Sequence, residues 1–209
     1  MSSTTVAQEN KTGARIGARQ IAVTGMLGAV AIILQFFELV VPIMPSFIKL
    51  DLSDLPGLVA AFALGPWYGV AVCLIKNLFH LATSSSALVG ELCNFLLGAS
   101  FVLPAGLIYK YNKTKKGALI GAVIGAICMA AFSFPSNLFI TYPMYINLYG
   151  MSEDAILGMY QAILPAVKTL PQCLLVFNLP FTFAKAMISV VITLVIYKPL
   201  SPILHGRDR

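Results

Sequence analysis

Residues 117–142 read GALIGAVIGAICMAAFSFPSNLFITY, an apolar run without a single charged side chain. A helix needs roughly 20 mainly apolar residues to cross the hydrocarbon core of a bilayer, and this run exceeds that length. The same character extends through the chain: 58% of its 209 residues are hydrophobic, 11% are charged, and the mean hydropathy is +0.86. Because soluble domains keep about a quarter of their residues charged, the sequence predicts an all-α membrane protein.

Further apolar runs occupy residues 20–41, 55–64, 67–82, 88–109 and 177–198. The run 55–64 is too short to cross the membrane as a straight helix, because ten residues rise only about 15 Å. Gly65-Pro66 separates it from the next run. Two interpretations follow: one long kinked span over 55–82, or two shorter helices that fold back at Gly65-Pro66.

The basic residues distinguish the two interpretations, since Lys and Arg favour the cytoplasmic side of short loops. They gather before the first run, between the runs 88–109 and 117–142, and at the C-terminus: Lys11, Arg15, Arg19; Lys110, Lys113, Lys115, Lys116; Lys198, Arg207, Arg209. All three groups lie inside only if the chain crosses the membrane an even number of times between residues 19 and 110. The sequence therefore predicts six transmembrane helices with cytoplasmic N- and C-termini.

This topology divides the chain into a polar N-terminal arm (1–18), a six-helix membrane domain (19–204) and a short basic tail (205–209). The connection 143–176 lies outside, and within it Ser152, followed by two acidic residues, predicts the N-cap of a short helix near 152–164.

The connection 42–54, which also lies outside, begins with Pro42-Ile43-Met44-Pro45 and is extended by its prolines. We expect it to fold over an outward-facing cavity as a lid-like extracellular loop after the first helix. An ordinary connecting loop is the alternative.

Polar side chains interrupt the apolar runs or lie at their edges: Lys76, Asn77, Glu91, Asn94, Asn137, Thr182 and Lys185. An ionisable group in hydrocarbon costs several kcal/mol or more, so such residues usually mark a functional site. On the predicted topology they come from four helices at a similar depth near the outer leaflet. A cavity lined by amide, carboxylate, hydroxyl and ammonium groups suits a small polar-aromatic molecule. Alternatively, each residue alone could snorkel or hydrogen-bond a neighbouring helix.

Other features exclude several classes of function. No GxxxxGK[ST] sequence occurs, so the chain carries no P-loop for nucleotide hydrolysis. The four cysteines lack CxxC spacing and the two histidines have no ligand-spaced partner, so no metal site is expected. The net charge of +6 lies beside apolar runs rather than on a soluble face, which argues against nucleic-acid binding.

Two alternatives of other classes are a membrane enzyme acting on lipids and a structural scaffold. Glu91 is the only carboxylate near the converging amides, whereas acid–base or metal chemistry usually needs a cluster of acidic or His groups. A scaffold would not need intramembrane lysines. The sequence therefore favours neither an enzyme nor a scaffold.

In the first run, Gly25, Gly28 and Ala29 form a small-residue face suited to close helix contact, either with a partner or within the protein.

Several blocks resemble one family. The first is Lys49-Leu-Asp-Leu-Ser-Asp-Leu-Pro56, which runs into Ala61-Phe-Ala-Leu-Gly-Pro66 and Cys73-Leu-Ile-Lys-Asn-Leu78. The later blocks are Gly90-Glu-Leu-Cys-Asn-Phe-Leu-Leu-Gly98, Asn137-Leu-Phe with Pro143-Met-Tyr145, and Leu179-Pro-Phe-Thr-Phe-Ala-Lys185. Over residues 20–204 the chain resembles the riboflavin-specific (RibU type) S components, the substrate-binding subunits of energy-coupling factor (ECF) vitamin transporters.

The resemblance implies a six-helix protein of the bacterial plasma membrane with a vitamin pocket near its outer face, covered by the loop after the first helix. Riboflavin would be a transported ligand, and no cofactor or enzymatic activity is expected. The partners would be a transmembrane coupling subunit and two ATPase subunits of an ECF module. Carried over by position, the pocket includes Leu50, Asp51, Asn94, Asn137 and Lys185, while Gly25, Gly28 and Ala29 resemble the surface that docks on the coupling subunit.

To this pocket the polarity of the runs adds Glu91 and Thr182. At Thr182 the chain departs from the family pattern, which often reads Pro-Phe-Asn-x-x-Lys where this chain has Pro180-Phe181-Thr182-Phe183-Ala184-Lys185. An amide can donate and accept in one plane, whereas a hydroxyl reaches less far. The substitution is compatible with riboflavin through a bridging water or with a different vitamin, such as a B6 vitamer.

Overall fold

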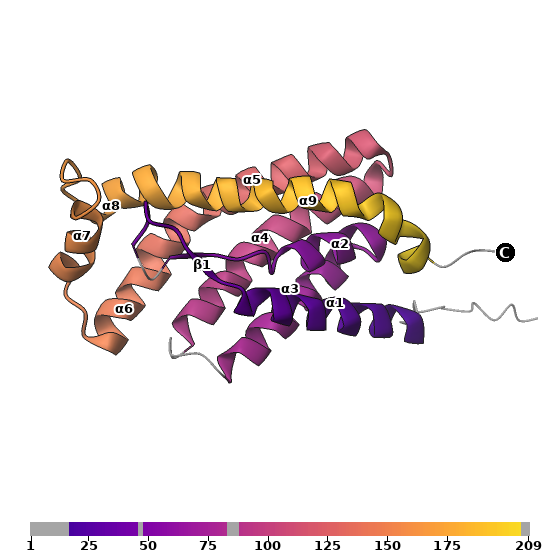
Figure 1. Ribbon diagram of the computed structural model, residues 1–209, viewed down its shortest axis with the longest axis horizontal. Coiled ribbons are helices and arrows are strands. Elements are labelled where there is room, and N and C mark those ends of the chain that lie inside the picture. Colours follow the sequence, from indigo (N-terminus) through magenta and orange to yellow (C-terminus); the bar gives the residue numbers. More distant parts are fainter. Residues whose placement is uncertain (1–16, 46–47, 83–87, 206–209) are drawn as a thin grey trace, which may run out of the picture.

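The computed structural model describes residues 17–45, 48–82 and 88–205, and these are mainly helical (Figure 1). Almost all of the predicted N-terminal arm and C-terminal tail lies outside the described residues. The helices are α1 (Ala18–Phe36), α2 (Leu55–Ala63), α3 (Pro66–Leu81), α4 (Val89–Tyr111), α5 (Lys115–Ser136), α6 (Tyr142–Tyr149), α7 (Glu153–Gln161), α8 (Leu170–Cys173) and α9 (Leu179–His205). Two π-helical segments, η1 (Asn137–Thr141) and η2 (Leu174–Asn178), join α5 to α6 and α8 to α9.

Within the described part of the chain, four continuous helical stretches are long and apolar enough to cross a membrane. They are Ala18–Phe36, Val89–Tyr111, Lys115–Leu148 and Leu170–Ile196. The prediction of an all-α membrane protein is therefore confirmed in its class.

The break at Gly65-Pro66 is confirmed, because α2 ends at Ala63 and α3 begins at Pro66. Gly65 has a φ of +124°, a conformation that L side chains rarely adopt. Helix α2 has 9 residues and rises only about 13 Å. It is preceded by the non-helical residues 51–54, of which Asp51, Ser53 and Asp54 are buried. Irregular backbone is tolerated at membrane depth only where protein or a water-filled cavity surrounds it.

The connection between α1 and α2 contains a short antiparallel strand pair that the sequence does not predict. Strands β1 (Leu39–Val40) and β2 (Lys49–Leu50) align Leu39 with Leu50 and Val40 with Lys49. An ion pair between Lys49 and Glu38 lies beside this pairing. The connection thus doubles back on itself before it enters the protein.

Close packing of α4 against α5 depends on the glycines of α5. A Cβ atom at Gly125 would lie 2.4 Å from the carbonyl oxygen of Phe101, and one at Gly121 would lie 2.8 Å from that of Ala105. Apolar side chains of α2, α3, α4, α5 and α9 complete this core, and a second apolar cluster joins α1 to α2 and α3. Small residues that let backbones approach are the usual means of helix association in membranes.

Helices α6, α7 and α8 cover one end of the bundle, which we call the cap end (Figure 1). Their apolar side chains form a third cluster around the fully buried Tyr160 and Ile156 of α7. The predicted N-cap is confirmed, because the Ser152 hydroxyl accepts a hydrogen bond from the Ala155 backbone N–H. The helix is shorter than predicted, since it ends at Gln161.

The β1–β2 pair lies towards the cap end. At the opposite end lie the start of α1, the α2–α3 corner, the α4–α5 connection and the end of α9 (Figure 1).

Candidate functional site

A cavity of about 630 Å³ opens towards the cap end, within the size range of small-molecule sites. Its wall is built from the end of α1, the connection between α1 and α2, and the elements α3, α4, α5, η1, α6, η2 and α9. The polar members of this wall are Gln35, Glu38, Lys49, Asp51, His80, Glu91, Asn94, Asn137, Thr141, Tyr142, Tyr145, Asn178, Thr182 and Lys185.

The structure brings most of the predicted binding residues into this wall. Asp51, Glu91, Asn94, Asn137, Thr182 and Lys185 all line the cavity. Leu50 lies half-buried in β2 and is not among the lining residues, although Lys49 and Asp51 on either side of it are. Lys76 and Asn77, which also stood out in the sequence, are buried and do not line the cavity.

The two intramembrane lysines are paired with two aspartates of the α1–α2 connection. The Lys185 Nζ atom lies 2.8 Å from Asp51 Oδ2 and 3.8 Å from Asp54 Oδ2. The Lys76 Nζ atom lies 2.6 Å from Asp54 Oδ1 and donates to Ser53 Oγ over 2.5 Å. Lys76 is completely buried, and the other members are nearly so. We call Asp51, Ser53, Asp54, Lys76 and Lys185 the ion network.

The ion network balances two ammonium groups against two carboxylates, so no net charge is buried. Asp51 also accepts hydrogen bonds from the backbone N–H of Ser53, over 2.9 Å, and from the Ser53 hydroxyl. The first of these bonds satisfies one backbone N–H of the irregular segment before α2, and the lysine pairs fasten this segment to α3 and α9. Removing one member of a buried pair leaves an uncompensated charge and is strongly destabilising.

Two π-helical segments shape the cavity wall, and the sequence does not predict them. In η1 the Tyr142 N–H bonds the Asn137 carbonyl, and in η2 the Leu179 N–H bonds the Leu174 carbonyl. Both segments are followed by one residue and then a proline, in Thr141-Tyr142-Pro143 and Asn178-Leu179-Pro180. Because proline has no N–H, it cannot continue the regular i→i−4 ladder.

Such π-helical segments occur frequently at functional sites. Here they supply Asn137, Thr141 and Asn178 to the cavity. Thr141 and Asn178 were not predicted from the sequence, in which the repeated proline spacing was the available signal.

Side chains of the cap reach the cavity through Tyr160. Its hydroxyl donates to Asn178 Oδ1 over 2.7 Å and bonds the hydroxyl of Tyr142. Burial raises the pKa of Tyr160 well above its ordinary value, so this hydroxyl stays protonated as a donor. Helix α7 is thereby tied to two residues of the cavity wall.

Of the remaining polar groups in the cavity wall, some form hydrogen bonds or ion pairs within the protein and others do not. Asn137 Nδ2 donates to the Ser133 carbonyl over 2.7 Å, and His80 Nδ1 lies 3.0 Å from Glu91 Oε1. Asn94 and Thr182 have no side-chain hydrogen-bond partner among the described residues. Their amide and hydroxyl groups are therefore available to a molecule in the cavity. No group of His, Cys, Asp or Glu side chains suited to hold a metal occurs in the described residues.

The small-residue face predicted on α1 is only partly exposed in the structure. Gly25 and Ala29 are exposed, and nothing lies within 4 Å of a Cβ atom added at Gly25. Gly28 is buried, and a Cβ atom there would lie 2.9 Å from Ile75 Cγ2. Gly28 therefore packs against α3, and its assignment to a partner surface needs correction.

Comparison with known proteins identifies close similarity to one transporter family. The family model for the ECF transporter, substrate-specific component, matches residues 19–197. The riboflavin transporter RibU of Staphylococcus aureus is 30% identical, over 89% of this chain and 92% of that protein. The riboflavin transporter FmnP of Bacillus subtilis is 26% identical, over 88% of this chain and 93% of that protein.

Among solved structures, the S component of a bacterial ECF transporter superposes with a TM-score of 0.70 at 30% sequence identity. The match covers 91% of this chain and 98% of that one.

The ion network predicts a specific pattern of stability. Lys76→Met leaves Asp54 buried with only the more distant Lys185, and we expect it to lower the free energy of unfolding by about 3–5 kcal/mol. Adding Asp54→Asn should recover part of that loss, because the orphaned charge is removed. Unfolding titrations in mixed detergent micelles would measure both changes.

Lys168→Met is the matched control, since Lys168 is exposed. If Lys76→Met unfolds no more readily than Lys168→Met, the buried pair does not stabilise the fold.

Proposed function

The chain belongs to the family of substrate-specific components of ECF transporters, and from this premise we propose that it binds riboflavin at the outer face of the membrane. It delivers the vitamin inward when coupled to an ATP-driven module made of other chains. Members of this family are components of transporters rather than enzymes, and the chain is a multi-pass protein of the bacterial plasma membrane.

The observation that carries the proposal is the cavity, in which uncommitted polar groups lie beside aromatic ones. Asn94 and Thr182 offer an amide and a hydroxyl, and Phe36, Tyr142 and Tyr145 offer aromatic faces. Riboflavin carries a flat ring system with a polar edge that both donates and accepts hydrogen bonds, so this combination suits it. The relatives described as riboflavin transporters align over nearly the whole chain, which supports the same ligand.

The proposed binding residues are those of the sequence analysis: Leu50, Asp51, Glu91, Asn94, Asn137, Thr182 and Lys185. Asn94 and Thr182 bind the ligand directly. Lys185 has three N–H donors, and its pair with Asp51 leaves donors for a ligand carbonyl. Asp51 acts mainly by holding Lys185, and Leu50 contributes as part of the loop that covers the ligand.

The proposed topology has six crossings with cytoplasmic N- and C-termini, a polar arm at 1–18, a membrane domain at 19–204 and a basic tail at 205–209. The α1–α2 connection is the outer lid. The second crossing combines α2, which is too short to cross alone, with residues 51–54. The burial of Asp51, Ser53 and Asp54 supports this assignment. The common position of the α2–α3 corner and the α4–α5 connection at one end supports the same arrangement (Figure 1).

The proposed partners are a transmembrane coupling subunit and two ATPase subunits of an ECF module. Gly25 and Ala29 are the docking surface on α1, because both are small and exposed. Small side chains let a partner helix approach the α1 backbone closely.

Thr182 favours a second candidate ligand within the same function, a B6 vitamer. The family pattern often has Asn at this position, and a hydroxyl in its place reaches less far and presents a different set of hydrogen-bonding groups. The ligand can be identified by titrating the purified protein with either vitamin.

Riboflavin fluorescence provides the direct test of the ligand. We expect the protein to quench it on binding, and Asn94→Ala to weaken binding by about 1 kcal/mol, the usual net value of a hydrogen bond. Thr182→Asn should hold or improve the affinity, because it restores the amide of the family pattern. Asn147→Ala, at an exposed position of α6, is the matched control.

Two outcomes would contradict riboflavin as the ligand. One is a parent protein that leaves riboflavin fluorescence unchanged while Thr182→Asn gains quenching. The other is saturable binding of a B6 vitamer that riboflavin does not compete away.

Cysteine labelling tests the topology. A membrane-impermeant maleimide added to intact cells should label Ser152→Cys and spare Lys115→Cys, because positive loops stay inside. The unsubstituted protein gives the background from its four native cysteines. Labelling of position 115 from outside would overturn the six-crossing arrangement.

Substitutions on α1 separate coupling from binding. Ala29→Leu should leave riboflavin binding by the purified protein nearly unchanged and impair uptake by the complete transporter, because added bulk prevents close helix approach. Val30→Leu, at another exposed position of α1, should impair neither. Gly28→Leu should instead reduce stability, since it meets Ile75. Normal uptake with Ala29→Leu would show that this face is not the docking surface.

A further inference from the structure

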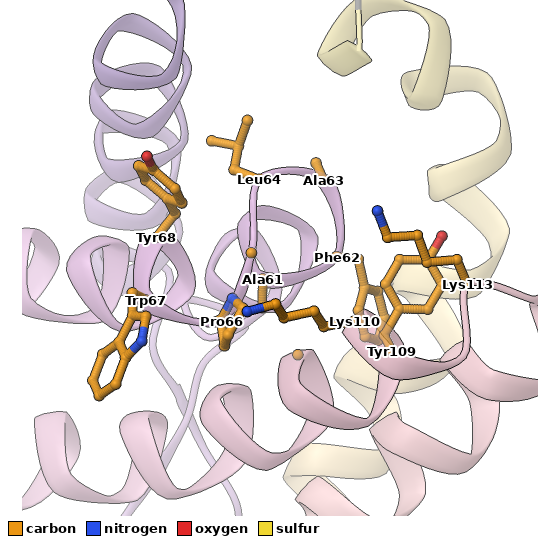
Figure 2. Close-up of a pocket in the computed structure, with 12 residues that line it drawn as sticks. Ala61, Phe62, Ala63, Leu64, Pro66, Trp67, Tyr68, Tyr109, Lys110 and Lys113 are labelled. Atoms are coloured by element: carbon orange, nitrogen blue, oxygen red, sulfur yellow. The ribbon is translucent and has the colours of Figure 1, made fainter. Parts of the chain in front are cut away.

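A second cavity, of about 380 Å³, lies at the α2–α3 corner (Figure 2), at the end of the molecule opposite the cap (Figure 1). We call it the corner pocket, because it is built around the α2–α3 corner and the end of α4. Phe62, Pro66, Trp67, Tyr109, Lys110 and Lys113 line it. None of these residues lines the cavity at the cap end, which we call the vitamin cavity.

Close packing brings Lys110 to the corner. A Cβ atom at Gly106 would lie 2.9 Å from the Cα atom of Pro66, so α4 contacts the beginning of α3 directly. Lys110 lies one helical turn beyond Gly106 on the same face of α4. Figure 2 shows its side chain extended towards Pro66.

The corner pocket is basic, and its charge is not balanced within the described protein. Neither Lys110 nor Lys113 forms an ion pair or a side-chain hydrogen bond among the described residues. The carboxylates that the structure describes are in the vitamin cavity, the ion network or α7. The carboxyl ends of α2 and α4 also lie here, and their partial negative charge disfavours an anion. The attraction for an anion therefore comes from the lysines and from the N-terminus of α3.

The remaining wall of the corner pocket is aromatic. Trp67 is 71% exposed, and the rings of Tyr109 and Phe62 pack with centroids 4.9 Å apart. Trp and Tyr are typical of the level of lipid headgroups, and here an exposed Trp and a half-buried Tyr lie beside two lysines. A basic pocket between transmembrane helices on the cytoplasmic side matches the sites that hold anionic lipid headgroups.

We propose that the corner pocket binds the phosphate headgroup of an anionic phospholipid. Lys110 and Lys113 attract the phosphate, and the indole N–H of Trp67 is available as a further donor. The acyl chains then lie along the apolar surface next to the pocket, where Leu107 and Leu74 are exposed. This site is independent of vitamin binding.

Trp67 reports on the site, because it is the only tryptophan of the chain and lines the pocket. The protein would be placed in phosphatidylcholine nanodiscs that contain a small fraction of phosphatidylglycerol brominated on its acyl chains. Bromine quenches tryptophan on contact. We expect half-maximal quenching at a mole fraction on the order of tenfold lower than with brominated phosphatidylcholine, given the attraction of two lysines near a membrane surface.

Two double variants make the test specific. Lys110→Gln with Lys113→Gln should abolish the preference for phosphatidylglycerol. Lys115→Gln with Lys116→Gln removes the same charge from exposed positions that do not line the pocket, and it should retain the preference. Quenching of riboflavin fluorescence by the same preparations verifies that each variant is folded. If none of the preparations quenches riboflavin, that result would count against the proposed function and not against the lipid site.

Three results would overturn the proposal. Equal loss of the preference in both double variants would show that the preference depends on the general surface charge and not on the corner pocket. Loss of the preference on adding water-soluble glycerol phosphate would show a site for a free phosphate compound. Retained preference in Lys110→Gln with Lys113→Gln, accompanied by failure to assemble with the coupling subunit, would make the pocket a protein interface.

Discussion

Two buried ion pairs, Lys76 with Asp54 and Lys185 with Asp51, hold the connection between α1 and α2 inside the helix bundle. Helix α2 is too short to cross a bilayer, so the chain reaches its start through four non-helical residues. That backbone is stable in a membrane protein only when its polar groups are satisfied by other protein groups. Here Asp51 accepts a hydrogen bond from the Ser53 backbone N–H, and the lysines of α3 and α9 pair with the aspartates of the same segment. These contacts fix the position of α2 against the remaining helices.

One of these pairs, Lys185 with Asp51, also lies in the wall of the vitamin cavity. Asp51 and Lys185 belong both to the ion network and to the cavity wall, so a substitution there changes the stability of the fold and the lining of the cavity together. The connection is also restrained at the β1–β2 pair, where Glu38 meets Lys49. The lysines of the cavity wall are already paired with carboxylates, whereas Asn94 and Thr182 have no side-chain hydrogen-bond partner among the described residues. Recognition by neutral groups suits an uncharged vitamin ring better than a phosphorylated one.

Local and compositional signals were sufficient for much of the fold and of the candidate site. Apolar length identified the membrane class, Gly65-Pro66 the break between two helices, and Ser152 a helix start. The polar residues that interrupt the apolar runs include five that line the cavity: Glu91, Asn94, Asn137, Thr182 and Lys185. The partners of the lysines were not predictable, because Asp51 and Lys185 are 134 positions apart and pair only in the folded protein. Gly28 was misassigned because helical spacing groups small residues without indicating which of them faces a neighbouring helix.

Exposed apolar side chains carry little information about partners in such a protein, because lipid and a partner helix are equally apolar. Side-chain size and charge are more informative. Exposed Gly25 and Ala29 leave the α1 backbone open to close approach, whereas the bulky exposed residues of α1, such as Ile33, are equally suited to lipid. The lysines of the α4–α5 connection have no described carboxylate beside them, while the described acidic side chains pair with lysine or histidine or lie near the cap. The described charges are therefore separated between the two ends of the bundle, with unbalanced positive charge at the end opposite the vitamin cavity, and this is the distribution that the proposed topology requires.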